Sequence, residues 1–91
     1  MIKGITISKN DNIIVAIEYI KKGEKIEYKT VDEKIKEIEI LEDIPIYHKI
    51  ALENINKGEI IKKYGEVIGI AIEEIKKGTH VHTHNIKSEK N

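Results

Sequence analysis

The sequence predicts a small, mostly β domain, and three observations lead to this fold class. Isoleucine occurs 22 times while Phe and Trp are absent, and isoleucine favours the pleated, half-buried surface of a sheet. Short β-branched runs alternate with clusters of turn-forming residues. One eight-residue segment is repeated three times, each time ending in Gly. With 91 residues the chain has the size of one domain, which we place over residues 3–87, with a disordered tail over residues 88–91.

The repeat has the form Ala, apolar, Glu, x, Ile, x, Lys, Gly and occupies residues 16–23, 51–58 and 71–78. Four positions separate its Ala from its Ile, so the segment can make one helical or 3₁₀ turn that points the Ile inward. Its Gly suits a left-handed exit from that turn, because only Gly adopts φ > 0 without steric cost. The copies start 35 and 20 residues apart, which excludes a solenoid of fixed period. We expect equivalent burial of three residues, Ile20, Ile55 and Ile75.

The strands follow from the same patterns. Residues 4–7 and 13–17 flank a polar turn, and residues 25–31 form a further extended run. Residues 31–41 fit helical spacing, but Ile38 and Ile40 alternate with glutamates and residues 32–34 can form a turn, so a hairpin is preferred. Pro45 ends that strand, because proline lacks the N–H donor.

Charge and composition exclude several partners. The formal net charge is zero and Arg is absent, so neither a basic patch nor an aromatic stacking surface supports nucleic-acid binding. No apolar stretch approaches the roughly 18 residues that a membrane-spanning helix needs, and the first residues show no secretory pattern. With no Cys there is neither a disulfide framework nor a thiol nucleophile. We therefore expect a cytoplasmic protein with no membrane or nucleic-acid partner.

Residues 79–85 continue the last repeat into a histidine-rich segment with His80, His82 and His84. In an extended strand these three side chains share one face. Neighbours then stand about 6.6 Å apart and the outer pair about twice that far, so a straight strand cannot easily bring all three to one ion. Two of them together with His48, or with a partner's carboxylate, could form an open metal site. The alternative is a histidine-rich strand that faces solvent or packs against a subunit.

Three segments, residues 43–52, 63–71 and 78–85, together resemble the N-terminal SAF domain of the altronate and galactarate dehydratases. The small subunit of the sulfolactate sulfo-lyases is similar. The resemblance covers about residues 3–87 and implies a β-clip, a folded-over and mostly antiparallel sheet with short 3₁₀ turns. The chain departs from the family pattern at Tyr47, where the family usually has Gly, and this tyrosine would narrow or cover the site at His48.

The resemblance also implies an activity. In those dehydratases most of the polypeptide is a C-terminal catalytic region, which this sequence does not include. We therefore expect a small SAF subunit of a hydro-lyase that eliminates water from a sugar acid or related hydroxy acid together with a separate large catalytic subunit, with little activity alone. One alternative is a non-catalytic SAF binding or assembly module, and another is the small subunit of a sulfo-lyase that releases sulfite. Exposed strand edges would also permit a homodimer.

The candidate site residues come from the motifs that carry the resemblance. Expected catalytic residues are His48, Lys49, His80 and His82. Expected ligands of a divalent metal, which the resemblance implies to be Fe(II), are His48, His80, His82 and His84. Lys49 could bind a substrate carboxylate as a compact cation or be one of many solvated lysines. Expected substrate contacts are Lys63, Tyr64 and Asn85, although Lys63 and Tyr64 could instead serve a turn, and Asn85 could orient a histidine or cap a strand end.

Overall fold

The computed structural model describes residues 2–6 and 8–88, and within these ranges it contains nine strands and no helix. The strands are β1 (Ile2–Ile5), β2 (Ile13–Ala16), β3 (Lys25–Lys29), β4 (Ile35–Glu39), β5 (Lys49–Ala51), β6 (Ile60–Lys63), β7 (Glu66–Ala71), β8 (His80–Val81) and β9 (Ile86–Lys87). Six strands form a sheet in the order β4-β3-β1-β2-β5-β8, and β6-β7-β9 form a second sheet. The predicted mostly-β fold is confirmed.

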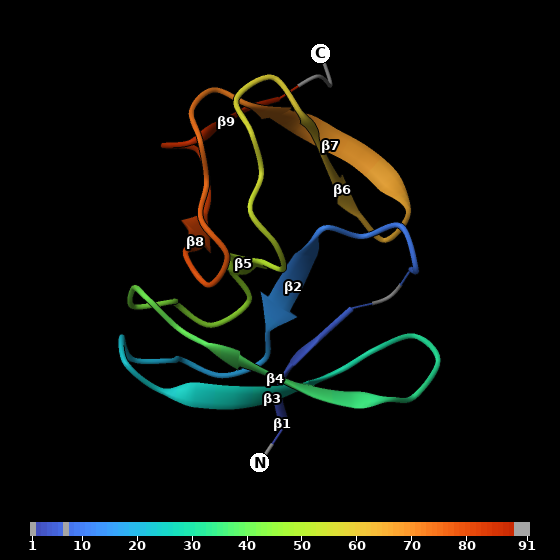
Figure 1. Ribbon diagram of the computed structural model, residues 1–91, viewed down its shortest axis with the longest axis vertical. Coiled ribbons are helices and arrows are strands. Elements are labelled where there is room, and N and C mark those ends of the chain that lie inside the picture. The colour runs from blue at the N-terminus through green and yellow to red at the C-terminus, as the bar shows by residue number, and fades with distance from the viewer. Residues whose placement is uncertain (1, 7, 89–91) are drawn as a thin grey trace.

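The larger sheet curls from one end of the molecule toward the three-stranded sheet at the other end (Figure 1). Strands β3 and β4 lie at one end and β6, β7 and β9 at the other, with β2, β5 and β8 between them. Neighbouring strands pair antiparallel, except that β1 runs parallel to β3. The curled sheet follows the β-clip expectation.

The predicted hairpin over residues 31–41 is confirmed. Strands β3 and β4 pair in a continuous antiparallel register in which Ile26 lies opposite Ile38, and both side chains are buried. The turn between them is fastened by Thr30, whose hydroxyl hydrogen-bonds Asp32 and accepts from the backbone N–H of Lys34 at 3.1 Å. Cross-strand packing of the isoleucines therefore outweighs the helical spacing.

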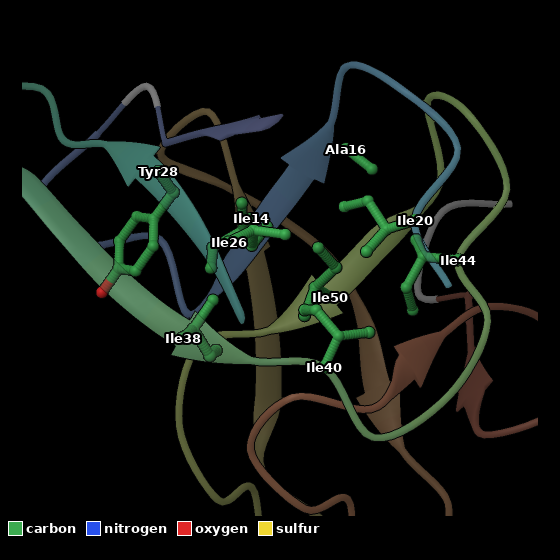
Figure 2. Packing of buried hydrophobic residues seen from close by; sticks show 9 residues of the cluster. All are labelled: Ile14, Ala16, Ile20, Ile26, Tyr28, Ile38, Ile40, Ile44 and Ile50. Carbon is green, nitrogen blue, oxygen red and sulfur yellow. The ribbon is translucent and has the colours of Figure 1, made fainter. Parts of the chain in front are cut away.

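The core consists of two isoleucine-rich clusters that share strand β2. All four residues of β2 are buried. Ile14 and Ala16 face the cluster shown in Figure 2, whereas Ile13 and Val15 face the cluster beneath β6 and β7. Because side chains alternate along a strand, one short segment serves both cores.

The repeats pair with one another through isolated bridges. Ile55 bridges Ile75, which joins repeat 51–58 to repeat 71–78. Ile20 of repeat 16–23 bridges Ile44, a residue that none of the three recognised copies contains. The expected burial of Ile20, Ile55 and Ile75 is confirmed at 0, 0 and 2% exposure. The repeats form bends closed by these bridges in place of 3₁₀ turns, since each Ile finds its hydrogen-bond partner in another repeat.

Ile44 belongs to a fourth copy of the repeat, residues 40–47, that sequence comparison missed. The amide of Gly23 donates to Ile40 and the amide of Tyr47 donates to Ala16. The other pair shows the same reciprocity, because Gly58 donates to Ala71 and Gly78 donates to Ala51. The last residues of the four copies all have positive φ, at 93°, 67°, 92° and 87° for Gly23, Tyr47, Gly58 and Gly78. The missed signal is the match of residues 41–44, Leu-Glu-Asp-Ile, to residues 52–55, Leu-Glu-Asn-Ile.

The predicted tail over residues 88–91 lies almost wholly outside the described residues; only Ser88 is described, and it is exposed. In the described part of the chain, no helix is long and apolar enough to cross a membrane.

Candidate histidine metal site

Three histidines from two segments converge at the junction of β5 and β8. His48 directly precedes β5, and His80 begins β8. These strands pair antiparallel, with Ile50 opposite His80, so residues 32 positions apart in sequence become neighbours. Nδ1 of His48 lies 2.8 Å from Nε2 of His80, a distance at which the two rings share one hydrogen bond. The ring centroids of His48 and His82 are 4.3 Å apart.

The histidine-rich segment is a short strand followed by a turn. The expectation that residues 80–84 are one extended strand is wrong, since β8 stops at Val81 and a turn follows. Asn85 closes this turn: its Oδ1 accepts from the N–H of His82 at 2.9 Å, and its Nδ2 donates to the carbonyl of His80 at 2.8 Å. The rings of His80 and His82 still face His48 together, and the residue that the turn displaces is His84.

Ligand atoms of His48, His80 and His82 all lie within 4.8 Å of one another. His84, also expected as a ligand, is outside this group; its ring stands 5.3 Å from that of His80 and is tilted by 39°. The turn at residues 82–85 carries it to the exposed side of the cluster. The expected contact of Asn85 with substrate also finds no support in its position, because its side chain is 4% exposed and both ends of its amide hold the turn.

The surroundings favour the neutral form of two histidines, His80 and His82. Burial lowers the pKa of His80, and the neighbouring rings of His48, His84 and His82 lower it further, against a smaller opposing effect of Glu42. Burial, His48, Lys49 and His84 lower the pKa of His82. Neutral imidazole is the form that binds metal, so both rings are in the correct state at neutral pH.

A lysine pair makes the region beside the cluster positive. Lys49, on β5, is half-buried, and its pKa is lowered first by burial and then by the charge of Lys63. Within residues 2–6 and 8–88 no carboxylate pairs with Lys49. Lys63 ends β6, and its Nζ lies 4.9 Å from the ring centroid of Tyr64, itself half exposed at φ 56°. An anion would relieve the repulsion between the two ammonium groups.

Glu42 is a residue of the site that sequence reasoning missed. Its Oε1 accepts the backbone N–H of His80 at 2.8 Å, so it fixes the first residue of β8. It stands in repeat 40–47 where the recognised copies have Glu18, Glu53 and Glu73. Identification of the fourth copy would have drawn attention to it.

The donor set fits a divalent transition metal. Imidazole nitrogens suit Zn, Cu, Fe and Ni, and three of them leave coordination positions for water or substrate, as catalytic sites require. The three rings are partly exposed, so small molecules can reach them. In the hydrogen bond between His48 and His80, one ring nitrogen donates its N–H to the lone pair of the other, so a metal bound by both nitrogens would take the place of this proton.

Comparison with known proteins identifies the family of this chain. The family model of the altronate/galactarate dehydratase SAF domain matches residues 2–89. The chain is 42% identical over 84 residues to altronate dehydratase of Bacillus subtilis and 36% identical over 84 residues to that of Escherichia coli. Each alignment covers 92% of this chain but 16% of the relative, so the chain spans about a sixth of those proteins.

A second kind of relative has a similar length. The chain is 31% identical over 78 residues to the (2R)-sulfolactate sulfo-lyase subunit alpha of Chromohalobacter salexigens, an alignment that covers 85% of this chain and 83% of the relative. The match of the family model over nearly all residues, on a mostly-β fold, establishes that this chain belongs to the family of altronate/galactarate dehydratase SAF domains.

Proposed function

We propose that this chain is the SAF component of a lyase that eliminates water from a small hydroxy acid such as altronate. The observation that carries the proposal is the convergence of His48, His80 and His82, with ligand atoms within 4.8 Å. Beside them lies the ammonium of Lys49, which forms no ion pair with a carboxylate of the described residues. A dehydration of this kind needs a group that binds the departing hydroxyl and a cation that holds the carboxylate. The site offers both in adjacent positions.

In this proposal the three histidines would hold a divalent metal, which the family resemblance implies to be Fe(II), and the metal would supply Lewis-acid stabilisation of the leaving hydroxyl. Lys49 orients the substrate through its carboxylate, and Lys63 adds to the positive potential. Glu42 and Asn85 fix the backbone on either side of His80 and thereby the ring positions. Because His80 and His82 are kept neutral, they bind metal without first losing a proton.

We further propose that a separate catalytic polypeptide completes the active site. The dehydratases that this chain matches are about six times longer than the matched segment, whereas the sulfo-lyase relative is named as one subunit. On this basis the chain alone shows little turnover and provides the metal and carboxylate groups to a partner that brings the base for proton abstraction.

Metal titration of the purified chain tests the first half of the proposal. Fe(II), under anaerobic conditions, or Co(II) as a spectroscopic probe should bind with one equivalent, and His80→Ala or His82→Ala should weaken binding by about 10- to 100-fold. His84→Ala is the matched control, because His84 lies outside the group of three, and its effect should be small. Equal losses for all three variants, or no binding to the parent chain, would contradict the metal site.

Reconstitution tests the second half. Mixed with the large catalytic polypeptide of a dehydratase, the chain should support conversion of altronate to its dehydrated keto acid, and His80→Ala should abolish this. Lys49→Met should raise KM for the acid while metal binding is retained. Turnover that does not depend on adding this chain would leave it as a binding or assembly module.

Release of sulfite from sulfolactate is a second candidate activity, favoured by one observation: the chain covers 83% of a sulfo-lyase subunit alpha but 16% of the altronate dehydratases. The same site could serve, because sulfonate and carboxylate are both anions that a lysine binds. Assays of one reconstituted complex with both acids decide between water and sulfite as leaving group.

A further inference from the structure

Most strand edges at the ends of the two sheets are closed or very short. The outer strands are β4 and β8 in the larger sheet and β6 and β9 in the smaller one. At β8, the N–H and C=O of His80 bind the side chains of Glu42 and Asn85. At β6, the Oδ1 of Asn12 accepts from the N–H of Lys62 at 2.8 Å, and β9 has only two residues. Such closure is expected, because unpaired strand edges readily join other chains.

Strand β4, in contrast, has an open edge. The N–H of Thr30 donates to the carbonyl of Lys34 next to the β3–β4 ladder, and bonded pairs alternate with unbonded pairs along an antiparallel ladder. The N–H and C=O groups of Ile35 and Glu37 therefore point away from β3. In the described part of the chain no other strand or side chain binds these groups, and both residues are exposed.

The charges along β4 oppose pairing of this edge with a second copy of itself. In two antiparallel strands, residues that stand directly opposite one another share a face, and their side chains interact. Symmetric pairings of β4 with substantial overlap place Glu37 against Glu37, Glu37 against Glu39, or Lys36 against Lys36. Like charges directly opposite one another are destabilising. A second copy therefore fits the edge poorly, whereas a strand with the opposite charges fits it well.

A hollow of about 300 Å³ opens beside the last residues of this edge. Ile38 and Leu41 supply its apolar surface, and Leu41 is 39% exposed. Its charged groups, two carboxylates and two ammonium groups, belong to Glu37, Glu39, Lys25 and Lys77. Because these charges balance, the hollow itself favours an apolar side chain, and a strand added to β4 could place one there.

We propose that β4 is a docking edge for an extended segment of another protein, which adds to the larger sheet as an antiparallel strand. The segment exchanges backbone hydrogen bonds with Ile35 and Glu37, and bonds of this kind supply the affinity in strand addition. Its side chains decide the specificity: a basic one lies opposite Glu37, an acidic one opposite Lys36 and an apolar one opposite Ile38. The docking edge uses no residue of the histidine cluster.

Amide hydrogen exchange of the isotope-labelled, metal-free chain tests the edge. In the free chain the amides of Ile35 and Glu37 should exchange rapidly, whereas those of Lys36 and Ile38, which donate to β3, should exchange slowly. The probe is a peptide with blocked ends and the sequence Thr-Lys-Val-Lys-Glu-Val-Thr, written to pair antiparallel with residues 34–40. At saturation it should slow exchange at Ile35 and Glu37 by at least about tenfold and leave the rates in β6 and β7 unchanged.

Two changes to the peptide separate the backbone contribution from the charge contribution. Methylation of the backbone nitrogens of its second lysine and second valine should abolish binding, because these two amides donate to the carbonyls of Glu37 and Ile35. Exchange of its lysines for glutamate and of its glutamate for lysine should weaken binding about tenfold, because like charges then stand opposite one another.

A variant of the chain examines the same contact from the other side. Glu37→Lys should weaken binding of the original peptide about fivefold and should bind the charge-exchanged peptide more tightly than the parent chain does. Glu66→Lys is the matched control, because it makes the same change of charge at the start of β7 in the other sheet. It should alter the affinity for neither peptide.

Several results would overturn the proposal. These are absence of saturable protection at Ile35 and Glu37, undiminished binding of the N-methylated peptide, or equal affinity for the original and the charge-exchanged peptide. Protection of the same two amides in the free chain that grows with its concentration would identify a second copy as the occupant and would also overturn it. His80→Ala should bind the peptide as the parent chain does, so failure of the metal site and failure of this edge are separate outcomes.

Discussion

The two pairs of repeats have the same backbone and different chemistry at one position. In repeats 16–23 and 51–58 the residue after the final Gly is a glutamate that accepts the N–H three positions earlier: Glu24 binds Lys21 at 2.6 Å and Glu59 binds Asn56 at 2.8 Å. After repeat 71–78, Thr79 hydrogen-bonds the carbonyl of Lys76 at 2.6 Å. After repeat 40–47 the residue in this position is His48, whose ring hydrogen-bonds His80 in the histidine cluster instead.

Proline explains why this position is free for function. The residue that such a side chain would cap in repeat 40–47 is Pro45, which has no N–H to donate. A glutamate at position 48 would therefore have nothing to bind, while the backbone bond from the N–H of His48 to the carbonyl of Pro45, at 3.1 Å, is kept. The comparison shows that position 48 can hold a functional side chain because residue 45 has no N–H for a capping side chain to bind.

The largest expected difference in stability is between valine variants of two glycines, Gly58 and Gly78, that share a left-handed backbone conformation. Gly78 has φ 87° and a Cβ there would overlap the carbonyl oxygen of Glu39, whereas Gly58 has φ 92° with open space around it. Gly58→Val should lower the free energy of unfolding by about 1 to 2 kcal/mol from backbone strain. Gly78→Val should cost at least about 3 kcal/mol, because steric overlap is added to the strain. Urea unfolding measures both, and equal costs would contradict the close approach.

The next largest difference in stability is expected between variants of two residues that directly follow a repeat, Glu59 and His48. Glu59→Ala should lower the free energy of unfolding by about 1 kcal/mol, because the N–H of Asn56 loses its acceptor. In the metal-free chain, His48→Ala should lower the free energy of unfolding clearly less than Glu59→Ala does, because no capping hydrogen bond is lost. It should nevertheless weaken metal binding as strongly as His80→Ala. Thermal unfolding with and without metal measures both variants. Equal losses of stability for His48→Ala and Glu59→Ala would show that the His48 side chain also supports the fold.

Replacement of Tyr47, in contrast, should increase the stability of the protein. It is a 70% exposed tyrosine at φ 67°, in the position that the other three copies fill with Gly. Tyr47→Gly should raise the free energy of unfolding by up to about 1 kcal/mol, since the left-handed conformation costs a non-Gly residue about that much. Differential scanning calorimetry of the two proteins measures the change. A loss of stability would indicate that the tyrosine ring makes packing contacts that outweigh its strain.

The smallest effect is a pH dependence. The folded-state pKa values of His80 and His82 are lowered below the usual value of about 6.5, so the unfolded chain takes up protons first as pH falls. Stability of the metal-free chain should therefore be complete above about pH 7 and decline as pH falls below about 6.5. Melting temperatures from pH 8 to 5 measure the decline, which His80→Asn with His82→Asn should reduce. A flat profile for the parent chain would contradict the shifts.

Local patterns predicted much of the fold. Isoleucine content and turn clusters were sufficient for the β class, and alternation at Ile38 and Ile40 identified the hairpin. The glycine-terminated repeat correctly placed Ile20, Ile55 and Ile75 in the core. These features depend on side-chain type and short spacing, which a sequence shows directly.

The candidate site was less predictable because it depends on contacts distant in sequence. Spacing alone gave a straight strand for the three C-terminal histidines, and the turn closed by Asn85 could not be read from it. Strand spacing left open whether His48 or a carboxylate of a partner joins them, because it does not show which distant segment lies beside the histidines. The fourth repeat was missed because Ile40, Ile46 and Tyr47 replace its characteristic Ala, Lys and Gly, although the backbone retains the pattern.

Reciprocal pairing of the repeats has a consequence for folding kinetics. Repeats 16–23 and 40–47 close a loop of moderate length around the β3–β4 hairpin, and repeats 51–58 and 71–78 close one around β6–β7. The two loop closures therefore have similar entropic costs and can proceed independently. His48 follows the first closed unit and His80 follows the second. The three rings therefore meet only after both units have formed and joined along β5 and β8, and a metal that binds them would preferentially stabilise the last state reached on folding.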